Sequence, residues 1–157
     1  MNHHRPFVPG GDAQQLVGFS CSTGAPFEDE VENWINDDAV AWLNDVPYAT
    51  FQRKNLHLVE SDAGDIVAVF AWQDIVRIDV DGLWLEVVAV AVAHQHGGVG
   101  RQVLADAKAH LATVERDGDV IAGLVHPDNQ RSRDMLLADN WVRVGELDGH
   151  DLMMGHV

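Results

Sequence analysis

The hydrophobic residues of this chain follow two periods, and the period changes several times along the sequence. Runs of β-branched and aromatic residues predict strands, whereas apolar residues three or four positions apart predict amphipathic helices. The predicted strands span residues 56–60, 66–79, 83–92, 120–125, 141–144 and 152–154. Helices are predicted as two short segments after residue 27, one segment after residue 100 and another over 129–140. This order predicts a single α+β domain over residues 1–157, with a strand-helix-strand unit in its second half.

Turn residues and prolines set the boundaries of these elements. Asp81-Gly82 is typical of a two-residue hairpin turn, because glycine accepts a positive φ without strain. Pro47 closes the second of the two short helices, and Asp117-Gly118 ends the helix that follows the glycines. Residues 1–12 are expected to form a flexible arm and residues 15–20 a short strand.

Composition and charge narrow the classes of function. The 157 residues include 46% hydrophobic positions, which is enough for a sizeable core. The net charge of −15 repels nucleic acid and anionic membrane surfaces. Between Pro6 and Gln52 there is no Lys or Arg, so this stretch forms either solvated helix faces or a surface that attracts cations. Cys21 is the only cysteine, which excludes a disulfide within the chain, and the lack of a signal-like or membrane-spanning segment predicts a cytoplasmic protein.

The stretch 88–101 is the strongest candidate for function. An apolar strand passes into Gly97, Gly98 and Gly100, and helical periodicity then resumes. Free backbone N–H groups in such a turn, with the positive end of the helix dipole, suit a diphosphate. A tight turn with close helix packing would have the same glycines. A nucleoside triphosphate loop is excluded, because Gly100 is followed by Arg101-Gln102, and the glycines come too late in the chain for a dinucleotide fingerprint.

Two segments together resemble a known family. The first is Gln95-His96-Gly97-Gly98-Val99-Gly100, preceded by the strand residues Val88-Ala89-Val90. It is similar to the Gln/Arg-x-x-Gly-x-Gly/Ala motif of the GNAT superfamily of acyl-CoA-dependent N-acyltransferases. The second, Asn129 to Leu136, resembles that family's Asn-x-x-Ala/Ser-x-x-Leu-Tyr helix. The pair covers residues 83–145, which we expect to be the acyl-CoA-binding core.

The resemblance implies a mixed, mostly antiparallel central sheet flanked by helices, and acetyl-CoA as cosubstrate. In this reading the glycine turn holds the pyrophosphate, the strand before it pairs with the pantetheine arm, and the second helix completes the site. The implied cofactor-binding residues are Val88, Val90, Gln95, His96, Gly97, Gly98, Val99, Gly100, Arg101, Asn129 and Ser132. Four basic residues lie in the segments expected to face the phosphates, namely Arg101, Lys108, Arg131 and Arg133.

Glu86 is the candidate general base for attack by an amine on the thioester. It interrupts an apolar strand, where an unpaired carboxylate is costly and burial favours its protonated form. Its position relative to the motif also resembles the acidic position that many family members use. The resemblance further implies that a strand N–H near Val90 stabilises the oxyanion. Leu136 stands where the family usually has a proton-donating Tyr, which leaves water, Ser132 or His126 to supply the proton to the thiolate.

Other residues have less specific readings. His94 and His96 flank Gln95, but no third ligand is evident, so no metal site is expected. Tryptophans are mostly core residues, although Trp34, Trp42 and Trp72 could line an acceptor pocket.

We therefore expect an N-acetyltransferase that acts on a primary amine of a cationic small molecule or basic peptide. The alternative is a non-catalytic acyl-CoA-binding or regulatory module, which the missing Tyr favours. A third reading, an acetyltransferase toxin acting on aminoacyl-tRNA, conflicts with the charge of −15. An exposed terminal strand could support a homodimer.

Overall fold

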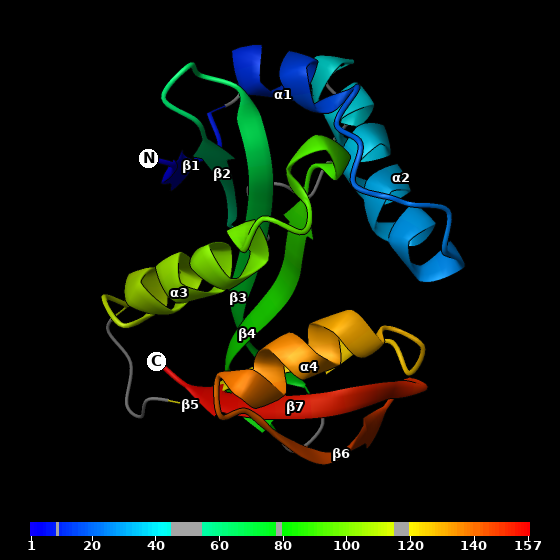
Figure 1. Cartoon of the computed structure of the whole chain (residues 1–157), viewed down its shortest axis with the longest axis vertical. Coiled ribbons are helices and arrows are strands. Elements are labelled where there is room, and N and C mark those ends of the chain that lie inside the picture. The colour runs from blue at the N-terminus through cyan, green and yellow to red at the C-terminus, as the bar shows by residue number, and fades with distance from the viewer. Residues whose placement is uncertain (9, 45–54, 78–79, 115–119) are drawn as a thin grey trace.

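The computed structural model describes residues 1–8, 10–44, 55–77, 80–114 and 120–157, which form one seven-stranded sheet with helices on both faces (Figure 1). The strands are β1 (His3–Pro6), β2 (Leu56–Glu60), β3 (Ile66–Arg77), β4 (Val80–Val90), β5 (Val120–Val125), β6 (Val142–Leu147) and β7 (His150–His156). The helices are α1 (Gly11–Leu16), α2 (Pro26–Leu43), α3 (Val99–Leu111) and α4 (Gln130–Ala138), with a 3-10 turn η1 (Val92–His94). The predicted α+β class is confirmed.

The strand order is β1-β2-β3-β4-β5-β7-β6, and every neighbouring pair is antiparallel except β4 and β5. The parallel pair is connected through α3, as expected for the strand-helix-strand unit. Its register pairs only Leu83 with Ile121 and Trp84 with Ala122. Beyond these residues the two strands diverge, and the divergence opens the centre of the sheet.

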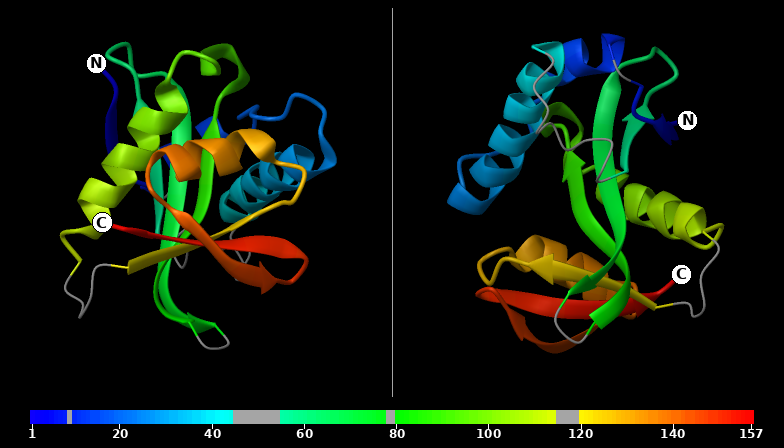
Figure 2. Two further views of the ribbon diagram at one scale, coloured as in Figure 1. Left: turned by 60° about the horizontal axis from the view of Figure 1, so that its bottom comes forward. Right: turned by 180° about the vertical axis from the view of Figure 1, so that it is seen from behind.

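Alternation along β3 divides the core into two clusters. Ala68 and Phe70 face the cluster that contains α3, whereas Val69 and Ala71 face the cluster built with α1 and α2. Side chains of period two point to opposite faces of a sheet, so the long apolar run of β3 needs cover on both sides. Figure 2 shows α1 and α2 on one side of the β3–β4 pair and α3 on the other.

The predicted flexible arm at residues 1–12 is wrong, because β1 pairs with β2 and α1 begins at Gly11. Arg5 holds this segment to the sheet through Asp12 at 2.7 Å and Glu60 at 2.7 Å. The hydrogen bond from Arg5 keeps the pKa of Glu60 below its ordinary value. The strand predicted at residues 15–20 is also wrong, since α1 runs to Leu16.

Two boundaries differ from the sequence prediction. The two short helices are one helix of 18 residues, α2, because Ile35 and Ala39 are four positions apart and both stay buried. Asp81 and Gly82 lie inside β4, opposite Val76 and Ile75, and do not form the hairpin turn.

The residues predicted to close helices, Pro47 and Asp117-Gly118, lie outside the described residues. The predicted closing hairpin is confirmed as β6 and β7. Its last strand lies inside the sheet, so the exposed edges are β1 and β6. A homodimer formed through an edge strand stays a prediction.

Candidate active site

A cleft opens where β4 and β5 diverge, and it consists of two adjoining cavities. The inner cavity, between the two strands, has a volume of about 460 Å³, and the turn cavity, beside the glycine turn, about 810 Å³. Residues that line both are Phe27, Val31, Val88, Asn129, Ser132 and Met135. The cleft is therefore continuous from the start of α3 to the middle of β4.

The glycine turn leaves its backbone open toward the turn cavity. His96 and Gly98 both have a positive φ, of 66° and 80°, and Gly98 is the residue before the first turn of α3. Helix N–H groups at this end have no side-chain cap, and the dipole favours an anion there. An added Cβ at Gly97 or Gly98 would meet nothing within 4 Å, so space remains beside both.

Gly100 lies closer to other side chains than the other two glycines do. A Cβ at this position would lie 3.4 Å from Sδ of Met135 and 3.8 Å from a methyl carbon of Val90. Both distances are ordinary van der Waals contacts, so the packing of α3 against α4 and β4 does not by itself require a glycine here. The positive φ of Gly98 does favour a glycine, which supports the turn explanation at that residue.

Gln95 fixes the turn to its surroundings. Its amide group donates to the carbonyl oxygens of Cys21 at 2.8 Å and Val90 at 3.0 Å. Arg131 donates to the Gln95 side-chain oxygen at 3.4 Å. Gln95 therefore links the end of β4 to the segment before α2. Burial raises the pKa of the Cys21 thiol to about 12, so this thiol stays protonated although it lines the turn cavity.

The start of α4 brings a second group of predicted residues to the cleft. Asn129 caps the helix, because its side-chain oxygen accepts a hydrogen bond from the Ser132 N–H at 3.1 Å. Both residues line both cavities. Of the predicted cofactor residues, Gly97 and Val99 are not among those that line the cleft. Val99 instead packs against the core.

Only two of the four predicted basic residues line the cleft, namely Arg101 and Arg131. Lys108 forms an ion pair with Asp139 at 2.6 Å. Arg133 is held by Asp151 at 2.7 Å, so its charge is used between α4 and β7. Lys108 and Arg133 thus pair with carboxylates outside the cleft, although they lie in the two segments expected to face the phosphates.

Glu86 lies at an irregularity of β4. Ala71 pairs with Val87 and Trp72 pairs with Leu85, which leaves Glu86 as an extra residue in the ladder. A bulge of this kind redirects a side chain. Glu86 is half-buried and lines the inner cavity with Glu30 of α2. Within the described part of the chain, no hydrogen bond or ion pair engages either carboxylate.

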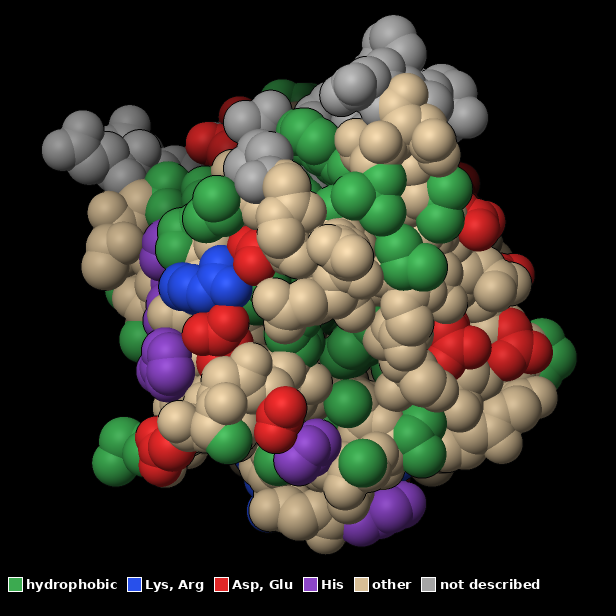
Figure 3. Space-filling view, turned by 90° about the horizontal axis from the view of Figure 1, so that it is seen from above, with side chains coloured by type: hydrophobic (Ala, Val, Ile, Leu, Met, Phe, Trp, Pro, Cys, Tyr) green, Lys and Arg blue, Asp and Glu red, His purple; other side chains and the backbone are tan. Residues whose placement is uncertain are grey.

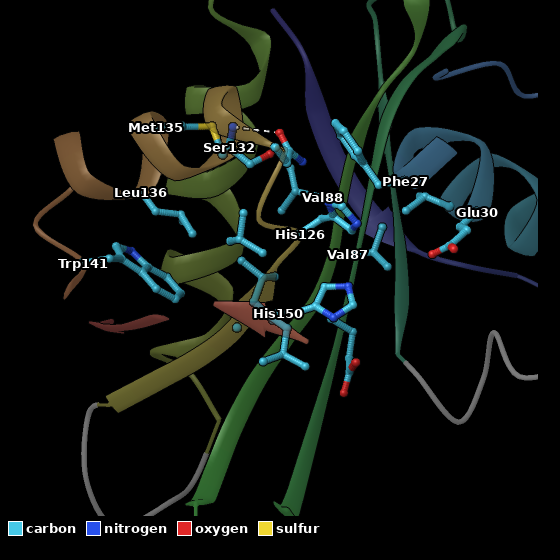
Figure 4. Close-up of a pocket in the computed structure, with 17 residues that line it drawn as sticks. Phe27, Glu30, Val87, Val88, His126, Ser132, Met135, Leu136, Trp141 and His150 are labelled. Atoms are coloured by element: carbon cyan, nitrogen blue, oxygen red, sulfur yellow. Dashed lines mark hydrogen bonds between the residues drawn. The ribbon is translucent and has the colours of Figure 1, made fainter. Parts of the chain in front are cut away.

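The inner cavity contains two imidazoles, His126, which the sequence analysis named as a candidate proton donor, and His150, which it did not. Figure 4 shows both rings in the cavity, with His126 near Phe27 and His150 on the far side of His126 from Phe27. The ring of His126 stacks on Phe27, with centroids 5.0 Å apart and planes at 17°. His150 meets His126 edge-on at 5.4 Å and 86°. The sequence pointed to His126, because it is three residues before Asn129 of the second motif. No feature of the sequence pointed to His150, which comes from the hairpin of β6 and β7.

Leu136 is buried and lines the inner cavity at the place expected for a Tyr. It supplies no hydroxyl group. Trp141 also lines this cavity, whereas Trp34, Trp42 and Trp72 are not among its lining residues. These three pack against the core clusters, so the expectation that they form the acceptor pocket is not supported.

Two general features of the described residues concern metals and membranes. No three or more of their His, Cys, Asp and Glu side chains are grouped so that they could hold a metal ion. None of the described helices is long and apolar enough to cross a membrane.

Comparison with known proteins rests on structure. No family model and no curated protein matches the sequence. The PaiA N-acetyltransferase from Thermoplasma acidophilum, solved with coenzyme A, superimposes with a TM-score of 0.69 at 12% identity, over 100% of this chain and 99% of that one. A GNAT-family acetyltransferase from Bacillus cereus gives 0.61 at 13% identity, over 98% and 94%. The chain has the GNAT fold.

Toxins of the same fold are also similar. A mutant of the AtaT toxin, bound to the C-terminus of its antitoxin AtaR and to acetyl-CoA, gives a TM-score of 0.70 at 10% identity, over 99% of this chain and 92% of that one. The GNAT fold thus accommodates more than one biological role, and the site residues must distinguish between them.

Proposed function

We propose that this chain is an acetyl-CoA-dependent N-acetyltransferase that acetylates a primary amine on a cationic small molecule or basic peptide. The observation that carries the proposal is the continuous cleft between β4 and β5. One end has a backbone turn and helix start suited to a diphosphate, and the other has two carboxylates without a partner among the described residues. Coenzyme A and acetyl-CoA in the PaiA and AtaT structures support the cosubstrate.

In this proposal the cofactor lies along the turn cavity. Backbone N–H groups between His96 and Arg101 hold the pyrophosphate, and the side chains of Arg101 and Arg131 add positive charge beside it. The edge of β4 from Val88 to Val90 is free of β5, so the pantetheine arm can pair with it like an added strand. Asn129 and Ser132 then contact the arm from the start of α4.

The reaction requires two protons to leave the nitrogen and one to reach the sulfur. An ammonium group loses its first proton to become nucleophilic, and the nitrogen loses the second after the C–N bond forms. The C–S bond then breaks, and the CoA thiolate takes up one proton. We assign Glu86 as a proton acceptor, directly or through water, and a strand N–H near Val90 as the oxyanion donor.

The acceptor class follows from the charge of the inner cavity. Its described lining includes Glu30 and Glu86 but no Lys or Arg. On the face drawn in Figure 3, acidic side chains are widely scattered, and the largest visible area of Lys or Arg lies directly against acidic side chains. Both features favour a cation and disfavour an anionic substrate such as aminoacyl-tRNA.

The test is acetylation of an amine panel that contains polyamines, aminoglycosides, amino acids and lysine peptides. We expect thiol release from acetyl-CoA with at least one cationic amine, and a product heavier by one acetyl group in mass spectrometry. Expression in a bacterial host should not arrest growth. Growth arrest together with acetylated aminoacyl-tRNA would contradict the proposed acceptor class.

Leu136 favours a second candidate function, a non-catalytic acyl-CoA-binding or regulatory module. This chain lacks the hydroxyl group that protonates the thiolate in the resembled family, although a thiol with pKa about 8.5 is a tolerable leaving group. Tight binding of acetyl-CoA by calorimetry, without turnover of any amine in the panel, would favour the module over the enzyme.

A further inference from the structure

The two imidazoles of the inner cavity are fixed in opposite tautomers by backbone hydrogen bonds. Nδ1 of His126 accepts a hydrogen bond from the Asp128 N–H at 3.1 Å, which places the proton of the neutral ring on Nε2. Nδ1 of His150 lies 2.9 Å from the Asp148 carbonyl oxygen. A carbonyl only accepts, so Nδ1 of His150 carries the proton and Nε2 of the neutral ring has a free lone pair.

The His150 ring is held in the same cavity as the proposed base. It contacts His126 edge-on, and His126 is in turn stacked on Phe27. The charged side chains that line the same cavity are the carboxylates of Glu86 on β4 and Glu30 on α2, and Asp128 lies beside His126. Asp148 precedes it in the hairpin turn. The next residue of β7, Asp151, is neutralised by Arg133 and Arg143.

Resting on the proposed function, we propose that His150 is a second catalytic proton acceptor, in addition to Glu86. Nε2 of His150 takes the first proton from the bound ammonium, while Nδ1–H stays on the Asp148 carbonyl oxygen. The amine then attacks the thioester carbon, and Glu86 takes the second proton as the C–N bond forms. When the C–S bond breaks, the imidazolium returns its proton to the thiolate. Glu86 releases its proton to water, so the reaction yields one free proton.

His150 can also protonate the CoA thiolate, which Leu136 cannot do in place of a Tyr. A protonated His150 is itself a proton donor for the thiolate, in a cavity whose described lining also includes Glu30 and Glu86. His126 keeps its Nε2–H and does not accept the proton in this arrangement. It is a positioning residue that holds the His150 ring.

The test compares His150→Gln with His156→Gln, a change on the same strand at an exposed site. Using the best amine from the panel, we expect His150→Gln to lower kcat/KM about 100-fold and to remove one ionisation from the acid limb of its pH profile. Its affinity for acetyl-CoA should stay unchanged, which shows that the variant is folded. His156→Gln should behave like the wild type. An unchanged profile in His150→Gln, or a lower rate with the same ionisations, overturns the inference.

A second measurement uses the wild-type protein without turnover. Nitrogen-15 NMR of the imidazoles at neutral pH should show Nδ1–H on His150 and Nε2–H on His126. The reverse tautomer on His150 overturns the inference independently of activity. If the wild type acetylates no amine at all, the proposed function itself fails and the inference falls with it. If the wild type is active and only the His150 results disagree, the proposed function stands.

Discussion

The two halves of the cleft are built in different ways. The turn cavity is lined by the glycine turn, the start of α4 and parts of α2 and β4, and the groups that we propose to hold the cosubstrate are backbone N–H groups of the single stretch from His96 to Arg101. The inner cavity is lined by parts of five elements, namely α2, β4, β5, α4 and β7. Its ionisable side chains come from four separate stretches of the chain: Glu30, Glu86, His126 and His150. The proposed anion-binding groups are therefore local in sequence, whereas the ionisable groups of the inner cavity meet only when distant elements pack together.

The largest expected effect on the reaction rate comes from the inner cavity, where we propose that the acceptor amine binds. Replacing Glu86 by Gln should lower kcat/KM about 100-fold, because the variant keeps the size of the side chain but removes a proton acceptor. Acetyl-CoA affinity, measured by calorimetry, should not change. Glu146→Gln on the exposed β6 strand is the control. Equal rates in Glu86→Gln and the wild type would remove Glu86 from the mechanism.

The next largest effect is expected on acetyl-CoA binding, when the backbone of the glycine turn in the turn cavity is changed. Gly98→Val should weaken acetyl-CoA binding by about 5- to 30-fold, because a β-branched residue in the left-handed conformation costs about 1–2 kcal/mol. Gly64→Val is the matched control, since Gly64 has a similar φ of 87° in the turn between β2 and β3, far from the cleft. If both variants bind acetyl-CoA equally well, the turn has no role in binding.

A smaller effect should separate the two groups of basic residues. Arg101→Ala and Arg131→Ala should each weaken acetyl-CoA binding by up to about fivefold, and added salt should reduce the difference, because both side chains are exposed. Lys108→Ala should leave binding unchanged and lower only the thermal midpoint, since Lys108 pairs with Asp139. Equal losses in all three variants would show that position along α3 and α4 does not matter.

The smallest effect at neutral pH is expected when a histidine cluster away from the cleft is changed, because this cluster affects the stability of the fold mainly at acid pH. His57 lies 3.4 Å from His4 between their Nδ1 atoms and 4.3 Å from His110 between ring centroids. Burial first, and then the neighbouring charges of His110 and His4, lower the pKa of His57 to about 4. Between about pH 6.5 and pH 4 the unfolded chain binds more protons than the folded one, so stability falls as the pH falls.

Chemical denaturation from pH 7 to pH 4 measures this loss. His57→Leu should reduce the slope of stability against pH in that window, while the acetyl-CoA affinity at pH 7 stays the same. If the slope is unchanged, the acid sensitivity belongs to other groups, such as Glu60 and Asp151, whose pKa values are lowered by hydrogen bonds from arginine side chains.

The sequence predicted most strands correctly where β-branched runs were long, as in β3, β4 and β5. It missed β1, because this strand has only four residues and is held at the sheet edge by contacts of Arg5 with Asp12 and Glu60. These contacts cannot be seen in the local pattern of apolar residues. It divided α2 because the large apolar residues of this helix fall into two groups, at 31–35 and 40–43, whereas burial of Ile35 and Ala39 on one face makes the helix continuous. The spacing of apolar residues predicts only local structure. The errors at β1 and α2 occur where contacts with other parts of the chain determine the secondary structure.

By itself, the sequence determined the backbone features of the turn cavity, namely the glycine turn and the helix start that we propose to hold the cosubstrate. Three glycines after an apolar strand, followed by a capped helix at Asn129, specify backbone conformation over short distances, and backbone N–H groups need no distant partner. The tertiary structure alone decided which side chains line the inner cavity. The divergence of β4 from β5, the bulge at Glu86 and the hairpin that carries His150 are set by strand pairing across the whole chain. The ionisable side chains of the inner cavity come together only after these strands pair, so no single stretch of sequence specifies their arrangement.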